Sequence, residues 1–133
     1  MVRRSPRAAV IVDTSGSMSE YDLGAALGAV KNIIESTGHA VDVFCADSEI
    51  LTRVRTRSVR EVKDVLKGGG GTDMATAIER VIKERNKPSV IVVLTDGITP
   101  WPIRKPSVPI IVGLIGDGEY PPPKWARVVR IKV

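Results

Sequence analysis

The stretch "AAVIVDTSGSMS", from Ala8 to Ser19, joins an uninterrupted apolar run to a loop rich in hydroxyl groups. A short run without polar residues is typical of a central parallel strand that is covered on both faces. Asp13 ends this run, and Ser15 and Ser17 follow in the loop. We therefore predict a buried strand whose carboxyl end opens onto a polar site.

Two other apolar runs repeat the pattern, "SVIVVLTD" at residues 89–96 and "VPIIVGLIG" at residues 108–116. Between the first two runs, apolar residues at helical spacing form two stripes: Leu23, Leu27, Val30, Ile33 and Ile34, then Met74, Ala77, Ile78, Val81 and Ile82. A shorter helix is expected at residues 58–67. The segment "VDVFCADSEILTRV" predicts two strands joined by a tight turn at Asp47 and Ser48, and "RVVRIKV" alternates as an edge strand does.

The predicted order, β-α-β-β-α-α-β-β-β, is that of an α/β domain spanning residues 1–133. We expect a compact, doubly wound, mostly parallel six-stranded sheet in the order 3-2-1-4-5-6, with strand 3 antiparallel and helices on both faces. Ser19 and Asp73 are suited to cap the two longer helices, and Gly38 to end the first. Three prolines in residues 97–107 predict that any helix between strands 4 and 5 is absent or very short.

Composition narrows the function classes. No segment approaches the roughly 20 apolar residues that span a bilayer, and "MVRRSPR" lacks the apolar core of a signal peptide, so we expect a cytoplasmic protein that does not contact a membrane. The single cysteine, Cys45, lies in an apolar run typical of a buried thiol. A net charge of +5 favours acidic partners but is weak for a dedicated nucleic-acid binder.

The carboxyl ends of strands 1 and 4 both carry aspartate, Asp13 and Asp96. In a doubly wound sheet with this strand order, ligands bind beyond these two ends. Two facing carboxylates repel unless a cation lies between them, and Mg²⁺ prefers oxygen ligands. Ser15 and Ser17 can supply two hydroxyls, and the glycine run "GGGG" before Thr72 can bring a third loop to the same place. The sequence therefore predicts a site for Mg²⁺, or for Mn²⁺ or Ca²⁺.

The set Asp13, Ser15, Ser17, Thr72 and Asp96 resembles the metal-ion-dependent adhesion site (MIDAS) of von Willebrand factor A (VWA) domains, with D-x-S-x-S in the first loop. The resemblance extends from Ala8 to Val133 and implies the Rossmann-like VWA fold. The glycine run and the short length are similar to the A-like domain associated with bacterial metallopeptidases. The resemblance implies that some carboxylates act through water and that a partner protein supplies a Glu or Asp to the metal. It also implies an ATPase-like or peptidase-like partner.

We expect a binding module and not an enzyme, because no base is well placed beside the cation. His39 is predicted at the amino end of strand 2, Asp73 as a helix cap and Asp117 as a turn residue. A Mg²⁺-dependent phosphotransferase-like hydrolase is the enzymatic alternative. Such enzymes resemble D-x-D-x-T after strand 1, where this chain has Ser15 in place of the second Asp.

Two other surfaces have open interpretations. Arg53, Arg55 and Arg57 alternate along strand 3, either as a nucleic-acid-binding row or as charges that protect a sheet edge from aggregation, and we favour the edge. Trp101, in "ITPWPIRKP", is either an anchor for a partner or a lid packed on the sheet. Tyr21 and Asp73 are further candidates for partner contact beside Trp101, and Tyr120 could join the same rim.

Overall fold

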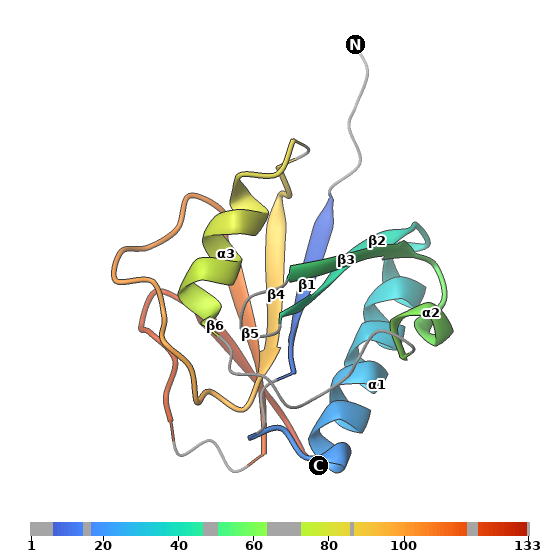
Figure 1. Ribbon diagram of the computed structural model, residues 1–133, viewed down its shortest axis with the longest axis horizontal. Helices are drawn as coiled ribbons and strands as arrows, with labels where there is room; N and C mark the ends of the chain where they lie inside the picture. The colour runs from blue at the N-terminus through green and yellow to red at the C-terminus, as the bar shows by residue number, and fades with distance from the viewer. Residues whose placement is uncertain are drawn as a thin grey trace.

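The computed structural model describes residues 7–14, 17–46, 51–63, 73–85, 87–116 and 120–132. Its centre is a six-stranded sheet in the order β3-β2-β1-β4-β5-β6 (Figure 1). The strands are β1 Ala8–Asp13, β2 Val41–Ala46, β3 Leu51–Thr56, β4 Val90–Thr95, β5 Ile110–Ile115 and β6 Arg127–Ile131. Every neighbouring pair is parallel except β2 and β3. The predicted strand order and the antiparallel third strand are confirmed.

Helices cover both faces of the sheet: α1 Glu20–Thr37, α2 Val59–Lys63 and α3 Met74–Ile82. Figure 1 shows α1 and α2 on one face and α3 on the other. Helix α1 begins at the predicted Ser19 cap, which forms a capping box: Ser19 Oγ accepts from Asp22 N at 3.1 Å, and Asp22 Oδ2 accepts from Ser19 N at 2.9 Å. It ends at Gly38, whose φ of 68° is the left-handed conformation that glycine adopts without strain.

Alternation along the strands divides the core into two layers. The α3 layer contains Ala9 and Ile11 of β1 with Met74 and Ile78 of α3. The α1 layer contains Val10 and Val12 of β1 with the buried stripe of α1, Ala26, Val30 and Ile34. Strand β1 is thus covered by a helix layer on each face. Its continuous apolar run predicts this arrangement.

The connection between β4 and β5 contains no helix at residues 96–109, in agreement with its prolines. Two predictions fall partly or wholly outside the described residues: the turn at Asp47 and Ser48, and the last turn of a helix ending at residue 67. Across the part of the chain that the structure describes, no helix has the length and apolar character needed to cross a membrane.

Candidate metal centre

Asp13 is the buried acid at the predicted site, and none of its surface is exposed. It lies two residues after Ile11, so it faces the α3 layer at the carboxyl end of β1. Thr95, the last residue of β4, donates its hydroxyl to Asp13 Oδ2 at 2.6 Å. The ends of β1 and β4 are thus joined side chain to side chain at the switch point of the sheet, the end at which doubly wound folds bind their ligands.

A second hydrogen bond sets the direction of the Thr95 hydroxyl. Gly97 N donates to Thr95 Oγ1 at 3.1 Å, so that oxygen is already an acceptor and its proton is directed to Asp13. Asp96, between the two, is half-buried, and its Oδ1 accepts from Ile98 N at 3.0 Å. This short turn carries the second predicted acid one residue after the threonine that bonds the first.

The turn after β4 requires a glycine at position 97. Its φ is 90°, and a Cβ at this position would lie 2.6 Å from the carbonyl oxygen of Tyr120. The β5–β6 connection therefore packs its backbone against the turn that carries Asp96. Tyr120 and Ile98, exposed at 52% and 48%, put apolar side chains on the same rim.

The β4–β5 connection also forms hydrogen bonds with the start of α3. In the sequence, Thr72 and Asp73 come directly before this helix. Thr99 Oγ1 accepts from Met74 N at 2.9 Å, and Pro100 O accepts from Ala75 N at 3.1 Å. Asp73 caps the helix, accepting from Thr76 N at 3.2 Å and from Thr76 Oγ1 at 3.0 Å. The predicted cap is present, and its carboxylate is occupied by the helix.

Three of the five predicted ligands are described: Asp13, Asp96 and Ser17. Ser17 is exposed in the turn before α1. Ser15 and Thr72 lie outside the described residues, so their placement stays a prediction. The described donors are hard oxygens, which suits Mg²⁺, Mn²⁺ or Ca²⁺. Within the described residues, no three His, Cys, Asp or Glu side chains gather at one point, and the predicted set of two acids with hydroxyls does not require such a group.

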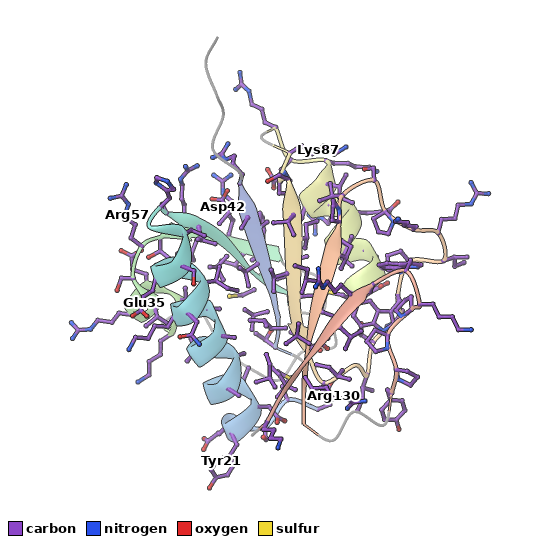
Figure 2. All side chains as sticks on the ribbon, turned by 180° about the vertical axis from the view of Figure 1, so that it is seen from behind. Tyr21, Glu35, Asp42, Arg57, Lys87 and Arg130 are labelled. Atoms are coloured by element: carbon purple, nitrogen blue, oxygen red, sulfur yellow. The ribbon has the colours of Figure 1, made fainter. Side chains whose placement is uncertain are left out.

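The proposed contact residues differ in exposure. Tyr21 is 79% exposed and projects from the start of α1, at the opposite end of the molecule from Asp42, Arg57 and Lys87 (Figure 2). Trp101 is half-buried and packs on the α3 layer, as Trp125 also does. Its Nε1 is buried and has no acceptor among the described residues. This packing corresponds to the lid, one of the two interpretations that the sequence left open.

Two residues of this end were not singled out from the sequence. Thr95 was not predicted to support the site, although its hydroxyl bonds an acid 82 positions away. Thr99 was not considered as a cap for α3, 25 positions earlier in the chain. The only sequence signal was the pair of threonines that flank Asp96 in "LTDGIT", one immediately before it and one three residues after it.

Other candidate groups lie elsewhere or are inert. His39 follows α1 at the amino end of β2. Asp13 lies at the carboxyl end of the parallel strand β1, so the two residues are at opposite ends of the sheet. Burial raises the pKa of the Cys45 thiol from 9.0 to about 11, so it is a poor nucleophile at neutral pH. Arg53 and Arg55 are exposed on the edge strand β3.

The sheet order, with one antiparallel edge strand and helices on both faces, is that of a VWA-type domain of Rossmann-like topology. The chain belongs to the family described as VWA-like domain (DUF2201), whose model matches residues 8–132. A protein of Thermotoga maritima described as uncharacterized is 30% identical over 118 residues, which are 86% of this chain and 29% of that protein. The chain thus spans less than a third of that relative.

Two solved structures share the fold. The VWA domain of SpRpn10 superposes with a TM-score of 0.64 at 13% identity, covering 97% of this chain and 89% of that one. Proximal thread matrix protein 1 from the mussel byssus gives a TM-score of 0.59 at 16% identity, covering 85% of this chain and 38% of that one. At these identities the likeness concerns the fold.

Proposed function

We propose that this domain docks protein partners through a divalent cation at the carboxyl end of its sheet. Asp13, Ser17 and Asp96, with Ser15 and Thr72, would hold Mg²⁺ or a similar ion, and a Glu or Asp of the partner would complete its ligands. Membership in a VWA-like family supports a protein-interaction module in general. The metal and the partner acid are proposed in addition, from the residues at the carboxyl end of the sheet.

The observation that carries the proposal is the buried carboxylate of Asp13, oriented by Thr95 at the switch point of the sheet. Burying an anion is costly, and a bound cation at its side offsets that cost. Hydroxyl ligands leave most of the charge of the ion uncompensated, so an anionic ligand from outside is favoured. An ATPase-like or peptidase-like protein is the partner class that the family resemblance suggests.

Calorimetric titration of EDTA-stripped protein with Mn²⁺ and Mg²⁺ tests this proposal. We expect saturable binding at one site. Asp13→Asn and Asp96→Asn remove a ligand charge and should weaken it by more than about tenfold. Thr95→Val keeps the side-chain shape but removes the donor to Asp13, and loss of such a supporting hydrogen bond lowers metal affinity by about 10–100-fold.

Asp42→Asn is the matched control, because Asp42 is a half-buried acid on the neighbouring strand β2 near its amino end. It should leave metal binding unchanged. Binding that is equally strong in Asp13→Asn, Asp96→Asn and Asp42→Asn would contradict the site. Circular dichroism of each variant separates loss of a ligand from loss of the fold.

A further inference from the structure

Strand β6 exposes apolar side chains on both of its faces. Val128 is 40% exposed and Val129 is 51% exposed, and as neighbours in a strand they point to opposite faces of the sheet. β6 is the last strand of the sheet, so within the described residues no strand pairs with its outer edge. Exposed valines beside unpaired backbone groups make this edge a template for another strand.

The charged side chains of the segment that contains β6 have one sign. Residues 121–133 contain four cations and no carboxylate. Lys124, Arg127, Arg130 and Lys132 are all exposed, and Arg130 is seen on β6 in Figure 2. A segment that binds here must therefore tolerate or complement a row of positive charge.

The other edge strand, β3, is built differently. Its exposed Arg53 and Arg55 share one face, opposite Phe44 and Asp42 of β2, while Thr56 is buried on the other face. An antiparallel pairing of two β3 strands that keeps their faces aligned sets arginine against arginine, as in Arg53 against Arg55. This edge is protected against strand addition by like charge.

Pairing of two β6 strands would avoid that direct clash. Centred on Val129, it sets Arg127 against Ile131 and Val128 against Arg130. It would still bring two sets of four cations together with no acid to offset them. An acidic segment removes this repulsion, and apolar residues in it cover Val128 and Val129. A nucleic acid would match the charge but would leave the two valines without an apolar neighbour.

We propose that β6 accepts an extended segment of a partner protein, with apolar and acidic residues on both of its faces, as a seventh strand of the sheet. The added strand forms backbone hydrogen bonds with the outer edge of β6. Its apolar side chains cover Val128 and Val129, and its carboxylates pair with Arg127 and Arg130. This docking surface is separate from the candidate metal centre and needs no cation.

Fluorescence anisotropy in EDTA tests the proposal with a labelled, end-capped peptide, Thr-Glu-Val-Glu-Val-Val-Glu-Thr. Two comparison peptides carry Lys in place of Glu, or Ser in place of Val. We expect the first peptide to bind more tightly than both. Arg130→Glu should weaken binding by about tenfold, because it replaces a cross-strand attraction by a repulsion, and Val129→Lys should weaken it as well. Amide hydrogen exchange of β6 should slow when the first peptide binds.

Arg55→Glu makes the same charge change on β3 and should leave binding unchanged. Equal binding of the Ser peptide, or an equal loss with Arg55→Glu, would reduce the interaction to general charge attraction and overturn the proposal. Tighter binding of an oligothymidylate, self-association of the free protein in sedimentation, or no peptide binding would overturn it too. The exposed positions of Arg130 and Val129 allow folded variants, and thermal unfolding of each checks this.

Discussion

The hydrogen bond from Thr95 to Asp13 helps to orient the buried carboxylate at the candidate site. Burial removes the water that would otherwise solvate the carboxylate, so the orientation of its oxygens depends on the groups that donate to it. Thr95 donates to one oxygen and receives from Gly97, which makes the threonine a fixed support. The surface at this end of the sheet then comes from Ser17, which is exposed, and from Asp96, which is half-buried.

Gly97 and Gly116 provide a matched pair for testing this support. Both have φ of 90°, but a Cβ on Gly97 would lie 2.6 Å from Tyr120 O, whereas a Cβ on Gly116 would meet nothing within 4 Å. Alanine meets the same positive φ at the two positions, so the difference between them reports mainly the clash. We expect Gly97→Ala to lower the free energy of unfolding by about 1–3 kcal/mol more than Gly116→Ala in urea titrations. Equal losses would contradict the close packing of the β5–β6 connection on this turn.

Single residues were predictable where local chemistry decides their role. The acids at strand ends, the Ser19 cap and the Asp73 cap follow from the residues around them. Thr95 and Thr99 were not predictable, because their partners lie 82 and 25 positions away and depend on how the elements pack. The placement of Ser15 and Thr72 stays a prediction.

At the scale of elements, β1, β4 and β5 were predictable from uninterrupted apolar runs, and α1 from its stripe of apolar residues at helical spacing. The β4–β5 connection was predictable only as a segment without a helix. Its actual role is to bond the start of α3 through Thr99 and Pro100 and to pack Trp101 on the α3 layer. Prolines thus give a segment without secondary structure a fixed path over the sheet.

Trp101 tests whether that segment is a lid. Because the side chain is half-buried against the core, Trp101→Ala should lower the free energy of unfolding by about 2 kcal/mol, less than the 3–5 kcal/mol of a fully buried aromatic. Trp101→Phe should cost less, since it keeps most of the packing and removes an N–H that has no acceptor among the described residues. Urea unfolding of the two variants measures both. An unchanged stability in Trp101→Ala would instead favour the anchor.

At the scale of the whole molecule, the two proposed surfaces lie on separate parts of one sheet. The candidate metal centre uses the carboxyl ends of β1 and β4, which are central strands, whereas the proposed strand-docking surface uses the outer edge of β6. Neither proposal needs the sheet to deform. The two proposals therefore concern surfaces that do not overlap, and each can be tested without the other.

Cys45 provides a test of the integrity of the whole fold through pH. The thiol is 4% exposed on β2, and its burial raises the pKa from 9.0 to about 11. Below pH 9 the thiol is protonated in both the folded and the unfolded chain, so its contribution to stability is fully present. As the pH rises from 9 toward 11, only the unfolded chain loses the proton, and stability falls by at most about 3 kcal/mol. Cys45→Ala should show a smaller fall over the same range in urea titrations, because other groups that titrate there affect both proteins equally. Parallel pH profiles for the two proteins would mean that the folded chain admits water to Cys45 and that the layer between the sheet and α1 is looser than the structure shows.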